Sequence, residues 1–207
     1  MLFIALRHAP PGLTTTRIPR VDLCVGQGTT DKAPCLYRSM ICFILQGSKR
    51  VAINDDLLSY DSEHYLISAL DLPLSGQILD AEGGEPYVAV SLVLAPAILA
   101  DLAASMPVIR ESEQKGIGIT INPMSASLRD TLLRLLSLLD TPADIPVLGP
   151  MVERELLYRL LQGPQGRLLR QMCSVSEAIT PTVRPVTRST SSVTPKVSAC
   201  AAKSARE

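Results

Sequence analysis

MICFILQGSKRVAI, residues 40–53, is the stretch that decides the fold. Two apolar, β-rich runs flank Gly47 and Ser48, a glycine-containing pair of the kind that connects the two strands of a β-hairpin. Further short apolar runs precede and follow it, separated by turn residues: VDLCV (21–25), YLISALDLPLSGQIL (65–79) and YVAVSLVL (87–94). Short strands at such close, regular spacing are typical of an antiparallel sandwich or a small barrel. We therefore expect one of these two architectures over residues 18–94.

After these strands the apolar residues change to the period of a helix. The segment PAILADLAAS (96–105) begins with proline, which is favoured at the first helical position. A longer helix is expected after Ser125 or Ser127 as N-cap, and another that begins at Pro150 and ends before Gly163. Their apolar faces are Leu128, Leu132, Leu135, Leu136 and Leu139 on the first, and Val152, Leu156, Leu157, Leu160 and Leu161 on the second. The expected class is therefore α+β, with strands first and helices after them.

The two leucine-rich helices carry more apolar surface than one stripe packed on a core requires. They can pack against each other, against the strands or against a second copy of the chain, and packing within the monomer remains an alternative. Since large exposed apolar patches commonly mark interfaces, we predict a homodimer through these helices. The residues expected in the interface are Leu132, Leu136, Leu156 and Leu160.

The composition is typical of a soluble protein with one main domain. A chain of 207 residues is long enough for a single sizeable core. Its 20 basic and 20 acidic residues cancel, so no overall charge attracts nucleic acid or an anionic membrane. Charges or prolines interrupt the apolar runs before they reach the ~20 residues of a membrane span. The five cysteines form no Cys-x-x-Cys pair, which favours a reducing, cytoplasmic location.

Residues for metal-dependent or nucleophilic catalysis are scarce. The two histidines, His8 and His64, stand alone, whereas metal-binding β-barrels of the cupin type use two or three histidines and a carboxylate. No Gly-x-Ser-x-Gly motif is present, and Cys42 is best explained as a small buried hydrophobic residue. The GQG at residues 26–28 lacks the third glycine of a dinucleotide-binding motif. We therefore expect no catalytic residues, no metal and no cofactor.

Polar residues among the strands suggest a ligand cavity. A few polar groups in apolar surroundings can orient a small molecule, and Gln46, Lys49 and Asp71 are of this kind. Each also has a structural explanation, Lys49 as a solvated turn charge and the other two as turn caps. The residues expected to line the cavity are Tyr37, Phe43, Gln46 and Tyr65. Alternation places Tyr37 and Phe43 on one face and Gln46 on the other, so not all four can point inward without a bulge or turn.

Four segments together resemble the N-terminal domain of AraC-type transcriptional regulators: TRIPRVDL (16–23), PCLYRSMICFILQGSKRVAI (34–53), YLISALDLPLSGQI (65–78) and LLRLLSLLDTPADIPVLGPMVERELLYRLLQGPQGRLLRQ (132–171). The resemblance covers almost everything in residues 18–172. It implies a cupin-like β-barrel at residues 18–94 that senses a small molecule, and helices at residues 95–172 that serve in dimerisation. It does not carry over the identity of the effector.

The two ends of the chain do not share this resemblance. Residues 1–17 are expected to be irregular. Members of the family continue after a GPQGxxLRQ segment into two helix-turn-helix units that bind DNA, whereas residues 173–207 here carry prolines and β-branched residues that oppose helix formation. We expect a disordered tail, explained by a shifted reading frame or a truncated gene, and no sequence-specific DNA binding by this chain alone.

The sequence thus predicts the effector-sensing and dimerisation domain of an AraC-family regulator, truncated before its DNA-binding domain. Its expected partners are a second copy of the chain and an unidentified small-molecule effector, with DNA bound only by full-length relatives. The alternatives are a stand-alone small-molecule-binding cupin, a dominant-negative partner of intact regulators, and a cupin enzyme.

Overall fold

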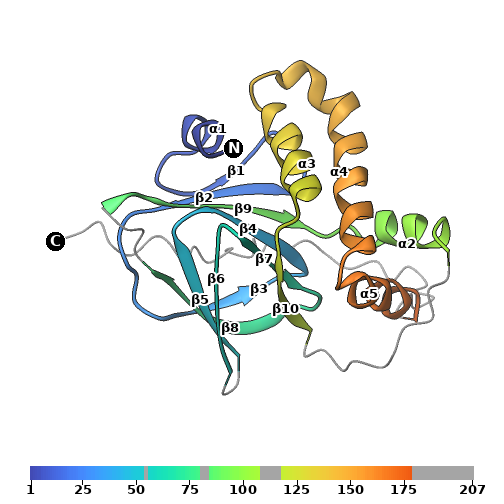
Figure 1. Cartoon of the computed structure of the whole chain (residues 1–207), viewed down its shortest axis with the longest axis horizontal. Helices are drawn as coiled ribbons and strands as arrows, with labels where there is room; N and C mark the ends of the chain where they lie inside the picture. The colour runs from blue at the N-terminus through green and yellow to red at the C-terminus, as the bar shows by residue number, and fades with distance from the viewer. Residues whose placement is uncertain (54–55, 80–83, 108–117, 179–207) are drawn as a thin grey trace, which may run out of the picture.

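Two antiparallel sheets and a group of helices make up the described part of the chain, which comprises residues 1–53, 56–79, 84–107 and 118–178 of the computed structural model (Figure 1). The strands are β1 Gly12–Thr15, β2 Val21–Gly26, β3 Ala33–Tyr37, β4 Met40–Gln46, β5 Ser48–Ile53, β6 Asp56–Asp61, β7 His64–Ser68, β8 Leu72–Leu79, β9 Tyr87–Val93 and β10 Ile119–Pro123. The helices are α1 Leu2–His8, α2 Pro96–Ala104, α3 Ala126–Ser137, the 3-10 turn η2 Pro142–Asp144, α4 Ile145–Gln162 and α5 Gly166–Ala178. The expected α+β class is confirmed.

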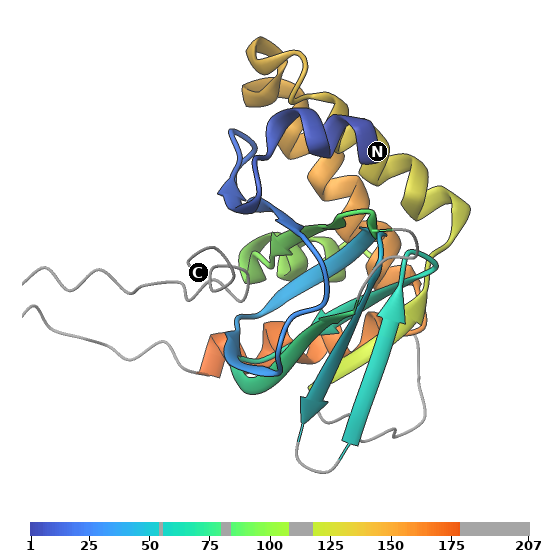
Figure 2. The same ribbon diagram turned by 90° about the vertical axis from the view of Figure 1, so that its left-hand side faces the viewer.

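The strands form a six-stranded sheet in the order β1-β2-β9-β4-β7-β10 and a four-stranded sheet in the order β3-β8-β5-β6. Among the described strands, no backbone pairing joins one sheet to the other, so the architecture is an open sandwich rather than a closed barrel. The helices α1, α3 and α4 lie on the side of the large sheet away from β3 and β8 (Figures 1 and 2). This gives three layers: helices, large sheet and small sheet.

The hairpin predicted at Gly47 and Ser48 is wrong. Strand β4 pairs with β7 and β9 in the large sheet, whereas β5 pairs with β6 and β8 in the small sheet. Gly47 has a φ of 81°, a left-handed conformation that glycine adopts without a steric penalty. The two strands and the glycine turn were predicted correctly, but the turn is a corner between the sheets.

The large sheet is buried on both faces, as β4 shows most clearly. Its residues Ile41 and Phe43 belong to the core shared with the helices, whereas Cys42 and Ile44 belong to the core between the two sheets. Successive side chains of a strand point to opposite faces, so a strand covered on both sides needs apolar residues at every position. This explains why MICFIL is a continuous apolar run rather than an alternating one.

The expected boundaries at the start of the chain and after residue 94 need correction. Residues 1–17 are not irregular, because they contain α1 and β1. Asp140 holds α1 in place: Arg7 Nη1 donates to its Oδ1 over 2.9 Å, and His8 Nε2 lies 2.7 Å from the same oxygen. Strand β10 follows α2 in the sequence yet extends the large sheet beside β7, so the strands do not all precede the helices. Such short segments show too little period to be recognised in the sequence.

The start of α3 and the end of α4 agree with the prediction, whereas the start of α4 does not. Ser125 is the N-cap of α3, where its Oγ accepts a hydrogen bond from Leu128 N at 3.2 Å. Helix α4 begins at Ile145 rather than at Pro150, because Pro146 occupies the first turn, where no backbone donor is needed. It ends at Gln162, directly before Gly163, as predicted.

Helix α5 runs to Ala178, beyond the expected limit at Met172. The rest of the predicted tail, residues 179–207, lies outside the described residues. In the described part of the chain, no single helix is long and apolar enough to cross a membrane. Only α3 taken together with Pro142–Gln162 has the length and apolar composition of a membrane span, and these two segments are bent by 107° relative to each other.

The leucines predicted for a dimer interface lie in the core of a single chain. Leu132 and Leu136 of α3 and Leu156 and Leu160 of α4 are at most 1% exposed, and all four belong to the core between the helices and the large sheet. A second copy of the chain therefore cannot contact these side chains without unpacking them. These four leucines therefore follow the alternative prediction, in which the helices pack within the monomer.

Two sets of polar contacts hold α4. Glu155 accepts hydrogen bonds from Arg134 Nη2 of α3 (2.6 Å) and from Arg159 Nε (3.0 Å), and these two guanidinium groups lower the pKa of Glu155 to about 2. Since Glu155 is partly exposed, its ion pair with Arg134 contributes little stability and serves mainly to orient α3 and α4. Glu153, by contrast, is buried, and both its oxygens accept from Arg20, at 3.0 Å from Nε and 2.5 Å from Nη2.

Arg20 connects three elements through this pair. It lies just before β2 and has a φ of 66°, which is uncommon for a residue with a side chain. Its carbonyl oxygen accepts from Val93 N of β9 at 2.9 Å, while its side chain binds Glu153 of α4. The paired charges thus tie the start of β2 and the end of β9 to the middle of α4.

Two glycines near each other in sequence should respond oppositely to alanine. A Cβ at Gly166 would overlap the carbonyl oxygen of Leu161, so Gly166→Ala should lower the free energy of unfolding by about 2 kcal/mol or more. A Cβ at Gly149 would only touch Ile145 Cγ2 at 3.6 Å inside α4, so Gly149→Ala should raise it by about 0.5–1 kcal/mol. Urea denaturation followed by circular dichroism measures both. Equal effects of the two substitutions would contradict this local packing.

Candidate ligand site between the two sheets

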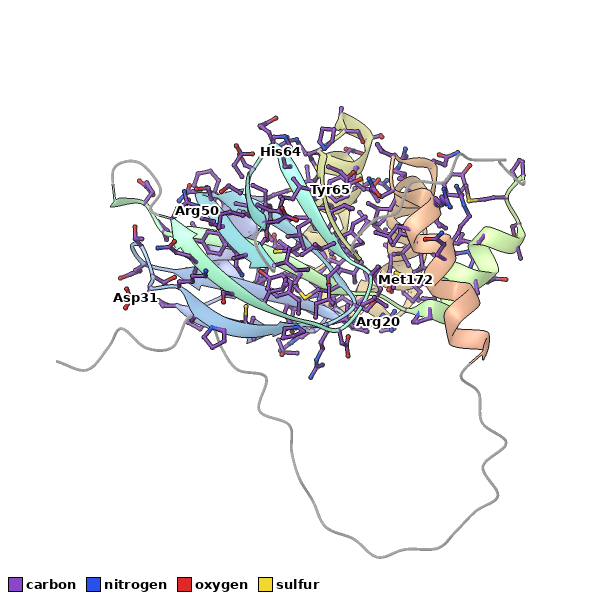
Figure 3. All side chains as sticks on the ribbon, turned by 90° about the horizontal axis from the view of Figure 1, so that it is seen from below. Arg20, Asp31, Arg50, His64, Tyr65 and Met172 are labelled. Atoms are coloured by element: carbon purple, nitrogen blue, oxygen red, sulfur yellow. The ribbon has the colours of Figure 1, made fainter. Side chains whose placement is uncertain are left out.

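The four residues predicted to line one cavity lie in three different places. Tyr37 is buried between the two sheets. Phe43 and Tyr65 lie on the opposite face of the large sheet, in the core shared with the helices, with ring centroids 5.8 Å apart. A Cβ on Gly163 would lie 3.6 Å from Tyr65 Oη, so that hydroxyl reaches the end of α4 (Tyr65 is labelled in Figure 3). Gln46 follows a β-bulge and donates its amide to Pro86 O at 2.8 Å.

The prediction for these residues was wrong because it applied one alternation to two sheets. Tyr37 and Phe43 are an even number of residues apart, but β3 belongs to the small sheet and β4 to the large one. Because the chain changes sheets in the turn between β3 and β4, alternation along one strand does not continue into the next. Asp71, the other polar candidate, is a cap: its Oδ1 accepts from Ser39 N at 2.9 Å.

Lys49 points into the space between the sheets. It pairs directly with Tyr60 of β6 and with Ile78 of β8, so the three side chains share one face of the small sheet. That face is the inner one, because Tyr60 and Ile78 are each only 2% exposed. The Lys49 Nζ lies 5.1 Å from the centroid of the Tyr37 ring. Lys49 is therefore not the solvated turn charge that one interpretation of the sequence suggested.

Two tyrosine hydroxyls in this core have no hydrogen-bond partner in the part of the chain that the structure describes. Tyr37 Oη and Tyr60 Oη are both fully buried, in residues that are 4% and 2% exposed. Leaving a buried hydroxyl unsatisfied costs about 1–3 kcal/mol, and native structures contain few such groups. The Lys49 ammonium lies over the face of the Tyr37 ring.

The electrostatics leave one cation among neutral hydroxyls. Burial raises the pKa of Tyr37 to about 12, although Lys49 opposes this, and burial raises the pKa values of Tyr60 and Tyr87 well above the usual value. Burial tends to lower the pKa of Lys49, but the neighbouring Tyr37 and Tyr87 outweigh this and raise it well above its usual value. At neutral pH the site therefore presents an ammonium group and phenol groups that remain protonated.

The rest of the inner space is apolar. Its buried side chains include Ile44, Val51, Leu66, Leu74 and Ile78. Cys42 is buried there as well, with Cys24 and Cys35 packed against the same core. In the described ranges no group of three or more His, Cys, Asp or Glu side chains is placed to hold a metal ion. The arrangement is that of a small-molecule site: apolar walls with a few polar groups.

Tyr60 and Tyr87 were not predicted from the sequence, and an inward-facing Lys49 was predicted only as an alternative. A signal for Lys49 was present, because it alternates in step with Val51 and Ile53 along one strand, and both of these are buried. A charged residue in phase with the apolar positions of a strand indicates an inward-facing charge.

Comparison with known proteins identifies the family. Residues 17–168 match the model of the AraC-type transcriptional regulator N-terminus. The chain belongs to this family. The resemblance of the sequence to AraC-type regulators is thereby confirmed, and the site between the sheets lies within an AraC-type N-terminal domain. No curated protein is similar enough in sequence to be matched.

One of three similar solved structures supports the same fold. An apo ToxT variant from Vibrio cholerae has 9% sequence identity and a TM-score of 0.51, over 82% of this chain and 69% of that chain. The AraC-like transcriptional activator CuxR has 14% identity and a TM-score of 0.40, over 86% and 58%. A cupin superfamily protein from Desulfitobacterium hafniense has 13% identity and a TM-score of 0.29, over 45% and 90%. At these identities the ToxT similarity concerns the fold alone.

Removing the unsatisfied hydroxyl of Tyr60 should stabilise the chain. Tyr60→Phe keeps the ring and deletes a buried group without a partner, so the free energy of unfolding should rise by about 1 kcal/mol. Ser68→Ala is the control, because the equally buried Ser68 Oγ donates to Leu70 O at 2.9 Å. That substitution should lower the free energy by about 1 kcal/mol. A loss of stability in Tyr60→Phe, measured by urea denaturation, would show that its hydroxyl has a partner.

Proposed function

We propose that this chain is the effector-sensing domain of an AraC-type transcriptional regulator, and that the effector binds between its two sheets. The observation that carries the proposal is the group formed by Lys49, Tyr37 and Tyr60 in an otherwise apolar interior. Unsatisfied polar groups that destabilise the empty protein gain partners when a ligand enters. In a regulator domain, such a site supports sensing rather than catalysis.

The helices can respond to the ligand through strands β2 and β9 of the large sheet. Strand β9 supplies Tyr87 to the ligand site and pairs with β2 along its length. Directly before β2, Arg20 holds β9 through Val93 N and α4 through Glu153. A shift of β9 caused by a ligand would therefore alter the position of α4. Glu153 is only 6% exposed whereas Arg20 is 36% exposed, so the pair joins the two elements while water screens part of its attraction.

An effector should be recognised by where it protects the backbone. The full chain is screened by thermal shift against small molecules of all charge types, since a ligand that binds the folded state raises Tm. For a compound that does so, hydrogen exchange should slow in β3, β5 and β8, which face the proposed site, and not in α1. Protection confined to the helices would contradict a site between the sheets.

We also propose that the domain forms a homodimer, through side chains other than the four leucines first expected. Exposed apolar residues of α4 gather on one side of the helix, namely Val147 (67% exposed), Leu148 (41%), Met151 (63%) and Tyr158 (39%). Their spacing places them within about 100° around the helix axis. Leu133 of the neighbouring α3 is 38% exposed as well. An apolar strip of this kind on a helix that already packs on its own core favours association.

Charged substitutions on this strip should dissociate the dimer without unfolding the chain. Val147→Glu combined with Met151→Glu should raise the dimer dissociation constant about 10-fold or more in sedimentation equilibrium. Leu57→Glu is the matched control, because Leu57 is 59% exposed on β6, in the small sheet. Leu136→Glu should unfold the domain instead, since Leu136 is fully buried. A wild-type chain that stays monomeric at tens of micromolar contradicts the proposal.

A further inference from the structure

We infer that the effector is a small monocarboxylate with an apolar body, whose carboxylate binds Lys49 together with the hydroxyls of Tyr60 and Tyr37. This inference rests on the proposed effector-sensing function and adds the chemical class of the ligand. Three features of the site carry it: an uncompensated cation, two buried donors and apolar walls.

The first feature is the charge of Lys49. Among the described residues, no carboxylate lies within ion-pairing distance of its ammonium group, whereas Arg7, Arg20, Arg129, Arg134, Arg154 and Arg159 all have such partners. Lys49 faces the inner core, where the Tyr37 ring lies beside its ammonium group and no carboxylate of the described residues neutralises its charge. A bound anion would supply the missing charge, and a cationic ligand would be repelled.

The second feature is the pair of tyrosine hydroxyls. Tyr60 lies directly across from Lys49 in the β5–β6 ladder, and the Tyr37 ring lies below the Lys49 ammonium. Each hydroxyl has a proton to donate and no hydrogen-bond acceptor among the described residues. A carboxylate has two oxygens that accept several hydrogen bonds, so one group can satisfy the cation and both hydroxyls.

The third feature distinguishes a carboxylate from a more highly charged anion. Arg50, the next cation along β5, points to the outer face, where its Nε lies 3.3 Å from Ser59 Oγ (Arg50 is labelled in Figure 3). The site thus contains the positive charge of Lys49 but not that of Arg50. A single positive charge suits a ligand with one negative charge better than a phosphate monoester, which carries nearly two. The walls beyond it, including Val51, Leu74 and Ile78, suit an apolar body.

The test compares carboxylates with their neutral amides on the full chain. The probes are benzoate, octanoate and 4-phenylbutyrate, each paired with its primary amide, and binding is measured by calorimetry. At least one carboxylate should bind about 10-fold or more tightly than its amide, as expected for a charge-assisted hydrogen bond. Lys49→Met should abolish the preference, and Lys49→Arg should keep part of it. Arg50→Met removes the same charge from the outer face of the same strand and should leave the preference unchanged.

Tyr60→Phe provides a second variant that does not depend on how Lys49→Met folds. It keeps the apolar ring and should weaken carboxylate binding about 5- to 10-fold while leaving the amide less affected. Equal binding of a carboxylate and its amide overturns the inference, as does carboxylate binding that neither variant changes. Neutral or cationic compounds that protect β5 and β8 while no carboxylate binds overturn the ligand class but leave the effector function standing. If no compound of any charge protects the sheets, the proposed function itself fails.

Discussion

Apolar burial on both faces of the six-stranded sheet is the constraint on which the other features depend. A sheet of this kind needs two covers, because either face would otherwise expose its apolar side chains to water. The helices cover one face and the four-stranded sheet covers the other. The chain accordingly leaves the large sheet at Gly47 and enters the four-stranded sheet at once. The tyrosines around Lys49 lie beneath that cover, where they are buried.

Much of the fold was predictable because long apolar patterns reflect burial directly. The strands around Gly47, the cap at Ser125 and the end of the last long helix at Gly163 all follow from local chemistry. Short segments such as α1 and β10 were not predictable, because they are held by distant partners: Asp140 for α1 and strand β7 for β10. The residues of α1 and β10 alone do not indicate which distant residues they will contact.

The candidate site was harder to predict than the fold for a related reason. Alternation tells which residues of one strand share a face, but not which sheet the strand joins, and Tyr37 and Phe43 were grouped wrongly on that account. Whether a tyrosine hydroxyl has a partner is decided by residues from several strands, so nothing near Tyr60 in sequence marks it. Lys49 was the exception, because its phase with Val51 and Ile53 places it on the buried face.

Alternate residues of β4 and β9 face two different cores, so the two cores can change independently in evolution. Cys42, Ile44, Tyr87 and Ala89 face the core between the two sheets, where we propose that the effector binds, while their immediate neighbours in sequence face the helices. Under this proposal, substitutions at the first four positions would change ligand recognition while leaving the packing against the helices in place. After a gene duplication, a copy could therefore evolve toward a new inducer through single-codon changes and keep its original regulatory response.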